Sequence, residues 1–327
     1  MVDMHVHLLS SEVGFRRFYD KLAIMFFARR LGANPRRLIK NSYEEYVNTL
    51  IKSVKTSKKI KKITLFGIDE KIDEEGKILH KDNTVCASND DVSDIYKKYP
   101  DIIIPFFSIN PLRKDALKLI DKYADEGFKG AKFMQNYWEI DTNDEKFIPY
   151  YEKLKEKNLP VIFHIGSESS LPSNKMYESL KMIELPLKLG LKVIAAHMAL
   201  SYEPLKMARA LKRNPKYYPK EYFTLIEMLK KYDNLYADIS AILTPVRAKT
   251  LRHLSREKEI HHKLLYASDY PVPFSIMLNS YDLPFLKRLK FVFEKNPFDR
   301  YALVIGEYFP PESAIYTNYK KALSLGE

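Results

Sequence analysis

Short β-forming runs and longer amphipathic stretches alternate along the chain. From residue 60 onward, runs rich in Ile, Val and Phe are each followed by a stretch with helical spacing, which is typical of repeated βα units. Eight strands are expected, at residues 2–7, 62–67, 102–108, 130–134, 160–164, 192–197, 235–239 and 264–268. Eight βα units in 327 residues predict an α/β fold of the (β/α)8 TIM-barrel class, because such barrels take about 250 residues plus insertions.

The segment that follows the first strand is too long for one βα connection. In residues 10–60 we expect two helices, over 13–31 and 42–58, that form a helical insertion over the barrel mouth. The second has the cleanest helical spacing in the chain. Ser42, with Glu45 three residues later, has the sequence of a capping box at its start.

A second helical insertion is expected after the sixth strand, over residues 201–232. Asn110 and Pro111 predict the cap and the first turn of another helix, since proline is favoured at the first helical position. No linker, internal repeat or low-complexity segment divides the chain. We therefore expect residues 1–327 to form a single domain.

Composition narrows the classes of partner. The net charge is +12, but the lysines are spread along the chain, which favours a solvated surface over a specific nucleic-acid partner. No apolar run approaches the roughly 20 residues that span a bilayer, so no membrane partner is expected. The single cysteine, Cys86, favours a reducing cytoplasm. Tyr217, Tyr218 and Tyr222, read as exposed aromatics, suggest a homodimer.

Four predicted strands run directly into metal-binding side chains. His5 and His7 end the first strand, and His164, His197 and Asp269 follow three later ones. Side chains two residues apart on a strand share a face, and the carboxyl ends of barrel strands meet at one mouth. Imidazole and carboxylate groups gathered there are the ligands of a catalytic divalent metal.

The same alternation assigns the other face of the first strand. Val2, Met4, Val6 and Leu8 alternate with the two histidines. We expect these four side chains to pack against the outer helices.

At these motifs the chain resembles the amidohydrolase superfamily, and within it the amidohydrolase-related branch that includes aminocarboxymuconate-semialdehyde decarboxylase. The motifs, in chain order, are Asp3-Met4-His5-Val6-His7, Gly127-Phe128-Lys129-Gly130-Ala131-Lys132, Ile162-Phe163-His164, Ala196-His197 and Ala267-Ser268-Asp269-Tyr270-Pro271. The resemblance covers nearly the whole chain. It departs at Gly306-Glu307-Tyr308-Phe309, where the family usually has Asn-Ala, and this leaves the C-terminal packing open.

The resemblance implies that His5, His7, His164 and Asp269 surround one divalent metal ion, usually Zn²⁺, with Mn²⁺, Fe²⁺, Co²⁺ or Ni²⁺ as other choices. It also implies that His197 is a nearby catalytic group. The residues are compatible with this, because three imidazoles and a carboxylate leave an open position for a water molecule that the metal activates. Asp269 is then placed to accept the water's proton, and His197 to donate to or stabilise the developing oxyanion.

Several further residues are candidates with open roles. Lys132 is suitably placed to bridge a second metal, as carboxylated lysines do in some superfamily members, but strand alternation does not decide whether it points inward, and one metal is the default. Asp238 either orients a ligand, meets the substrate or caps its strand. Arg247 is a candidate for binding a substrate carboxylate, and Tyr137 and Trp138 for a pocket wall.

The leading hypothesis is therefore a metal-dependent hydrolase, in which metal-activated water attacks a C–N or C–O bond of a small substrate, with or without a carboxylate. The alternative within the family is a lyase, a non-oxidative decarboxylase of an aromatic or unsaturated carboxylic acid. The alternative of another class is a basic nucleic-acid-binding barrel with a vestigial site. The ligands alone do not separate hydrolysis from decarboxylation.

Overall fold

The structure is a computed structural model that describes residues 1–14, 28, 31–167, 171–201, 214–244, 247–280 and 282–325. Within them, all eight predicted strands are confirmed, although most are shorter than expected. They are β1 (Val2–His7), β2 (Lys62–Phe66), β5 (Ile103–Pro105), β6 (Ala131–Phe133), β7 (Val161–Phe163), β8 (Val193–Ala195), β9 (Leu235–Asp238) and β10 (Leu264–Leu265).

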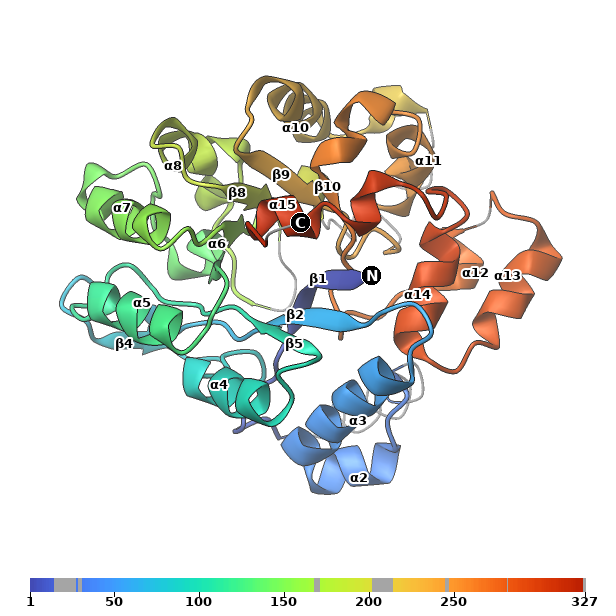
Figure 1. Cartoon of the computed structure of the whole chain (residues 1–327), viewed down its shortest axis with the longest axis horizontal. Coiled ribbons are helices and arrows are strands. Elements are labelled where there is room, and N and C mark those ends of the chain that lie inside the picture. The colour runs from blue at the N-terminus through green and yellow to red at the C-terminus, as the bar shows by residue number, and fades with distance from the viewer. Residues whose placement is uncertain are drawn as a thin grey trace.

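The eight strands form one parallel ring. One sheet has the order β1-β2-β5 and the other the order β10-β9-β8-β7-β6. At one seam the Lys132 amide donates to the Phe107 carbonyl at 2.8 Å, and at the other the Asp269 amide donates to the His5 carbonyl at 2.9 Å. Helices surround the strands (Figure 1). The predicted TIM-barrel fold is confirmed.

An irregularity in β1 changes which side chains face the barrel interior. The register with β2 shifts between Asp3 and Val6, as in a β-bulge, which adds one residue to a strand and reverses the alternation beyond it. Val2 and Met4 lie in the inner cluster, whereas Val6 lies in the outer core. The prediction that Val2 and Met4 pack against the outer helices is therefore wrong.

The helices connect the strands and cover the outside of the barrel. They are α2 (Pro35–Lys40), α3 (Ser42–Thr56), α4 (Asn89–Lys98), α5 (Ala116–Asp125), α6 (Gln135–Trp138), α7 (Ile148–Glu156), α8 (Glu184–Lys188), α10 (Lys220–Lys231), α11 (Leu251–Leu254), α12 (Ile276–Asn279), α13 (Phe285–Val292), α14 (Pro297–Ile305) and α15 (Tyr319–Ala322). A hairpin of β3 (Lys71–Ile72) and β4 (Ile78–His80) interrupts the connection between β2 and β5. Short 3₁₀ turns occupy Glu145–Phe147, Lys175–Tyr177, Leu180–Ile183, Ala196–Ala199, Pro215–Tyr217, Ala248–Thr250, Lys258–Lys263 and Ala314–Tyr316.

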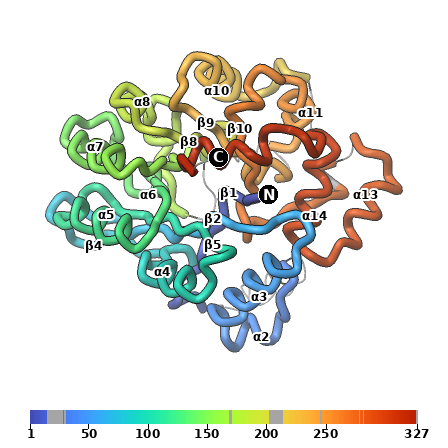
Figure 2. Tube along the Cα trace, in the orientation of Figure 1, coloured from blue at the N-terminus to red at the C-terminus, as the bar shows by residue number. Residues whose placement is uncertain are grey.

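The segment after β10 is more elaborate than the sequence patterns predict. It contains α12, α13, α14 and α15, whereas insertions were expected only after the first and sixth strands. α15 lies over the middle of the ring in Figure 1, and Figure 2 shows the C-terminal end there in the same orientation. Ala322 and Leu323 join the inner cluster that contains Val2 and Met4. The C-terminal helix therefore closes the bottom of the barrel. In the departing Gly306–Phe309 segment, Phe309 is fully buried, whereas Gly306 is exposed.

Two helix starts differ from the prediction. Asn41 occupies the N-cap position of α3, with no side-chain cap hydrogen bond, and the Glu45 carboxylate instead accepts from the Asn34 amide at 3.1 Å. The capping box is therefore wrong. Asn110 forms a turn, and α5 begins only at Ala116, because residues 111–115 make separate turns before it.

Part of each predicted insertion lies outside the described residues. Most of the helix expected over 13–31 falls there, as do residues 202–213 of the second insertion. In the described part of the first insertion, α3 packs on the outside of the barrel. The Tyr46 hydroxyl of α3 donates to the carbonyl of His7 at the end of β1, and Asp299 of α14 accepts from the Ser57 hydroxyl just beyond α3.

The surface differs from one expectation about aromatic residues. Tyr222 is fully buried and Tyr218 is 9% exposed, so they do not offer the exposed aromatic surface on which the homodimer was predicted. Apolar side chains are exposed on and next to α13 instead, where Leu286 is 77% exposed and Phe293 74%. In the part of the chain that the structure describes, no helix is both long and apolar enough to cross a lipid bilayer.

Candidate metal centre

Three of the predicted ligands meet at the mouth of the barrel. One donor atom from each of His5, His7 and Asp269 lies within 4.8 Å of the other two. The Asp269 Oδ1 atom is 3.4 Å from His5 Nε2 and 3.2 Å from His7 Nε2. The bulged end of β1 and the segment after β10 bring these side chains together across the seam that closes the barrel.

The donor atoms of this group suit a metal ion. Within the described residues, His5 Nε2 and Asp269 Oδ1 are buried and have no hydrogen-bond partner. Buried polar atoms usually have such partners because desolvation is costly. A cation between two imidazole nitrogens and a carboxylate oxygen would satisfy all three, and this donor set is one that zinc and similar ions accept.

The other two predicted histidines lie beside this group. The ring centroid of His197 is 5.2 Å from that of His5 and 4.9 Å from that of His164. His197 Nδ1 is 3.8 Å from Asp269 Oδ2. All five predicted residues therefore gather at one place, with His164 next to the group of three and in ring contact with His197.

Asp238, at the end of β9, contacts both His5 and His197. Its Oδ2 atom lies 2.7 Å from His5 Nδ1, and its Oδ1 atom accepts from the His197 amide at 2.9 Å and from the Ser240 amide at 3.0 Å. The Ser240 hydroxyl lies 2.8 Å from His197 Nδ1. The sequence left the role of Asp238 open and gave no reason to single out Ser240, whose only signal is its place just after a strand.

Strained backbone turns aim two of these side chains. His197 has φ of 58° and Asp269 has φ of 67°, in the left-handed region that non-glycine residues seldom adopt. Each follows a barrel strand, β8 or β10. Such conformations cost about 1–3 kcal/mol each and gather at functional sites.

Electrostatics favour the protonation states that metal ligands need, which are ionised carboxylates and neutral imidazoles. Burial alone would raise the pKa of Asp269, but the nearby imidazoles of His5, His197 and His7 bring it well below its usual value. Burial, followed by the charge of Arg247, lowers the pKa of His197 well below its usual value. Burial and the charge of Lys132 lower the pKa of His5.

Lys132 points into the barrel, which answers the question that strand alternation left open. Its side chain is fully buried, and Nζ lies 5.7 Å from the centroid of the Phe66 ring. That ring packs edge-on against His5, with centroids 5.0 Å apart. The neighbouring Phe133 points outward and contacts Trp138. A bridge to a second metal through Lys132 stays a prediction.

Arg247 lies near the centre. It is buried, and its Nε atom donates to the Leu200 carbonyl at 2.7 Å. Leu200 is in turn joined to His197, whose carbonyl accepts from the Leu200 amide at 2.9 Å, and the charge of Arg247 lowers the pKa of His197. A role for Arg247 in binding a substrate carboxylate stays a prediction.

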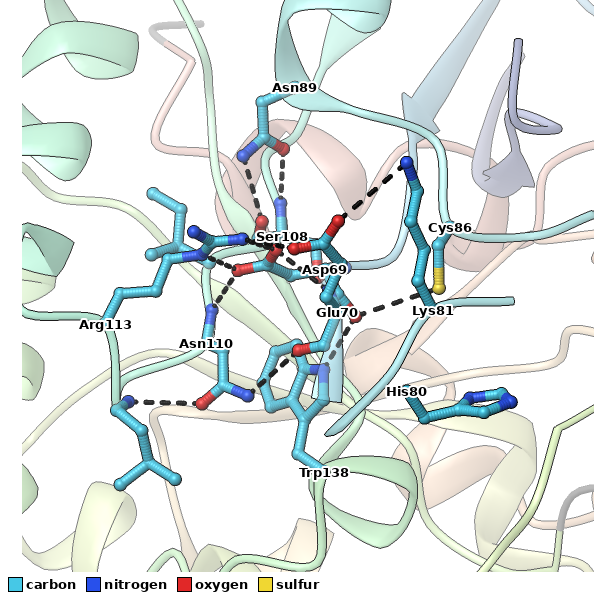
Figure 3. Close-up of polar contacts among 12 residues, drawn as sticks. Asp69, Glu70, His80, Lys81, Cys86, Asn89, Ser108, Asn110, Arg113 and Trp138 are labelled. Atoms are coloured by element: carbon cyan, nitrogen blue, oxygen red, sulfur yellow. Dashed lines mark hydrogen bonds and ion pairs between the residues drawn. The ribbon is translucent and has the colours of Figure 1, made fainter. Parts of the chain in front are cut away.

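Tyr137 and Trp138 hydrogen-bond to the connection between β2 and β5 that contains the β3–β4 hairpin. The Trp138 indole donates to the Asp69 carbonyl at 2.9 Å (Figure 3), and the Tyr137 hydroxyl donates to the His80 carbonyl at 3.0 Å. Arg113 holds the Asp69 carboxylate with two hydrogen bonds of 2.6 Å (Figure 3). Their predicted role as a pocket wall stays a prediction.

A TIM barrel that gathers a His-x-His pair, two further histidines and an aspartate at the carboxyl ends of its strands has the architecture of a metal-dependent hydrolase. In sequence, the chain matches the amidohydrolase family over residues 2–277. The chain belongs to this family, whose members are metal-dependent enzymes. No curated protein matches the chain in sequence.

Solved structures share the fold at low sequence identity. An uncharacterised TIM-barrel protein from Bordetella bronchiseptica is 18% identical with a TM-score of 0.56, over 93% of this chain and 99% of that one. A probable 2-pyrone-4,6-dicarboxylic acid hydrolase from Acinetobacter baumannii, with citric acid bound, is 14% identical with a TM-score of 0.54, over 99% and 98%. A 5-carboxyvanillate decarboxylase from Novosphingobium aromaticivorans, with manganese and 3-methoxy-4-hydroxy-5-nitrobenzoic acid bound, is 14% identical with a TM-score of 0.52, over 99% and 96%.

Proposed function

We propose that this enzyme is a metal-dependent hydrolase that uses water to cleave a C–N or C–O bond of a small, carboxylated substrate. The observation that carries the proposal is the group of His5, His7 and Asp269, whose donor atoms lie within 4.8 Å of one another. Cytoplasmic localisation is also part of the proposal, since the single cysteine, Cys86, stays reduced there.

In this proposal His5, His7, His164 and Asp269 hold one divalent ion. Zn²⁺ is the first choice, and Mn²⁺, Fe²⁺, Co²⁺ and Ni²⁺ are the others. When bound, the ion makes water nucleophilic near neutral pH and polarises the bond to be cleaved. His164 is included because its ring lies 4.9 Å from that of His197, beside the group of three. Lys132 is the residue that would bridge a second ion.

The protein's own groups then handle protons and charge. Asp269 takes the proton of the attacking water on a carboxylate oxygen. His197, 3.8 Å from that carboxylate, exchanges a proton with the oxygen or nitrogen on which charge develops. Arg247, buried near His197, binds the carboxylate of the substrate, because a guanidinium pairs well with such a group.

The ligands of structural neighbours support a carboxylated substrate. The hydrolase from Acinetobacter baumannii holds citric acid, and the decarboxylase from Novosphingobium aromaticivorans holds a nitrobenzoic acid. Decarboxylation is the second candidate. It is favoured by the buried, inward-pointing cation of Lys132 next to the centre, because a fixed positive charge stabilises the carbanion that remains when carbon dioxide leaves.

The test is metal analysis of the purified protein and of single variants. We expect one bound divalent ion per chain in the wild type, loss of that ion in His7→Ala, and much weaker binding in His164→Ala. His262→Ala, which changes an exposed histidine, is the matched control and should bind as the wild type does. The reconstituted enzyme is then assayed on lactones, esters and aromatic carboxylates.

Each outcome separates the hypotheses. Hydrolysis that depends on the ion supports the proposal, whereas carbon dioxide release without hydrolysis would establish the decarboxylase instead. A wild type that binds no Zn²⁺, Mn²⁺ or Co²⁺ at micromolar concentration, but binds DNA or RNA in a salt-sensitive manner, would replace the enzyme by the basic nucleic-acid-binding barrel.

A further inference from the structure

We propose that Asp238 is a positioning residue that sets two side chains of the centre at once, the ligand His5 and the proton-exchanging His197. This inference rests on the proposed function, because it assigns the partners of Asp238 their roles. Asp238 lies at the end of β9 and is fully buried. Its two carboxylate oxygens each face a different histidine.

The first oxygen fixes which nitrogen of His5 carries the proton. Oδ2 lies 2.7 Å from His5 Nδ1, and both side chains are fully buried. A carboxylate accepts hydrogen bonds, and a histidine that binds a metal through one ring nitrogen donates its other N–H to such a group, so Nδ1 holds the proton. The lone pair is then on Nε2, which faces Asp269 at 3.4 Å.

The second oxygen fixes the backbone and the ring of His197. Oδ1 accepts from the His197 amide at 2.9 Å, which secures a residue in the left-handed region with φ of 58°. The Ser240 hydroxyl also donates to Oδ1. A hydroxyl has a single proton, so the Ser240 oxygen is left to accept from His197 Nδ1, 2.8 Å away.

The other neighbours of His197 Nδ1 point to the same tautomer. The Ser240 carbonyl, 3.2 Å away, and Asp269 Oδ2, 3.8 Å away, are both acceptors. The proton of neutral His197 therefore sits on Nδ1, and its Nε2 atom carries a lone pair. In this form His197 can accept a proton at Nε2.

The contacts of Asp238 with His5 Nδ1 and with the His197 amide each need a hydrogen-bond acceptor, and a side-chain amide has only one oxygen. In Asp238→Asn one of the two positions becomes an NH₂ group. Whichever way that amide turns, it places a donor against either His5 Nδ1–H or the His197 amide. Ser240→Ala removes the hydroxyl that joins Asp238 Oδ1 to the His197 ring and leaves the contact between Asp238 and His5 intact.

The experiment compares these two variants in metal-free and metal-loaded protein. Nitrogen-15 NMR of the imidazoles reports the tautomer in the metal-free state, and calorimetric titration with Zn²⁺ reports affinity. For Asp238→Asn we expect about a 10–100-fold loss of affinity, the usual cost of removing a partner that orients a ligand, together with altered His5 or His197 signals. For Ser240→Ala we expect altered His197 signals alone and an affinity within about threefold of wild type.

The control is Asp299→Asn. Asp299 is also a buried carboxylate that accepts from backbone amides, at 2.9 Å from Lys58 and 3.0 Å from Lys59, but it lies outside the barrel. Its loss should leave metal affinity and imidazole signals unchanged. Wild-type affinity and tautomers in a folded Asp238→Asn would overturn the inference.

Two further outcomes are also decisive. If Asp238→Asn does not fold, a change of His5 signals or affinity in Ser240→Ala would overturn the inference, and a change of His197 signals alone would support it. If the wild type binds no metal, the proposed function fails, whereas the metal-free tautomers still test the role of Asp238.

Discussion

Replacing Trp138 by Phe tests whether this residue holds the β3–β4 hairpin against the barrel or lines the substrate pocket. Trp138 is the only tryptophan and is 1% exposed. Its indole donates to the Asp69 carbonyl at 2.9 Å, and its ring packs edge-on against Phe133, with centroids 5.2 Å apart. Phenylalanine keeps the aromatic contact but has no donor and a smaller ring.

The expected loss of stability follows from these contacts. Leaving the partly buried Asp69 carbonyl without its main donor costs about 1–3 kcal/mol, and the smaller ring loses roughly another 1 kcal/mol of apolar burial. The free energy of unfolding should therefore fall by about 2–4 kcal/mol. For a chain of 327 residues the entropy of unfolding is roughly 0.7 kcal/mol per kelvin, so Tm should fall by about 3–6 °C.

The assay combines thermal circular dichroism with amide hydrogen exchange and Zn²⁺ titration. We expect exchange to accelerate in the segment around Lys71–His80, because local opening depends on the contacts that hold a segment, while metal affinity stays unchanged. Unchanged stability and unchanged exchange in this segment would show that Trp138 does not hold the hairpin. A reduced affinity for carboxylate inhibitors with normal exchange would instead establish the pocket wall.

Two other buried groups give measurable expectations. Burial raises the pKa of Cys86 to about 11, so the folded protein keeps the thiol protonated at pH values where the unfolded chain has lost the proton. The free energy of unfolding should therefore fall as pH rises from about 9 to 11, and it should fall more steeply in wild type than in Cys86→Ala. Equal slopes in the two proteins would contradict the assignment. Asp299 accepts hydrogen bonds from the Ser57 hydroxyl and the amides of Lys58 and Lys59, so Asp299→Asn should lower the free energy of unfolding by about 2–3 kcal/mol in urea titrations; a loss below about 0.5 kcal/mol would show that the contact contributes little.

The strands were predictable because parallel strands buried on both faces are continuous runs of Ile, Val and Phe. Their carboxyl ends could be paired with the site because a barrel brings all such ends to one mouth. His5, His7 and Asp269 therefore meet although they come from opposite ends of the chain. The local signal and the global fold agree at these positions.

The missed features depend on geometry that a residue pattern does not carry. The bulge in β1 adds a residue without any characteristic side chain. Strict alternation counted back from His5 and His7 therefore assigns Met4 to the outer face, whereas it lies in the inner cluster. Asp238 ends a strand, and an aspartate at that position has the same sequence context whether it caps the strand or orients a metal ligand. Ser42 was displaced as a cap because Asn41 takes the N-cap position. Tyr222 is polar only at its hydroxyl, and its buried ring packs against the ring of His253, with centroids 5.7 Å apart.

The seam between β1 and β10 has a consequence for synthesis on the ribosome. Asp269 emerges about 260 residues after His5, which at 5–20 residues per second is roughly 13–50 s later. Until then β1 has an open edge where the His5 carbonyl will accept the Asp269 amide. The nascent chain must keep that edge from pairing with other chains, and it acquires the complete set of proposed metal ligands only when the last strand arrives.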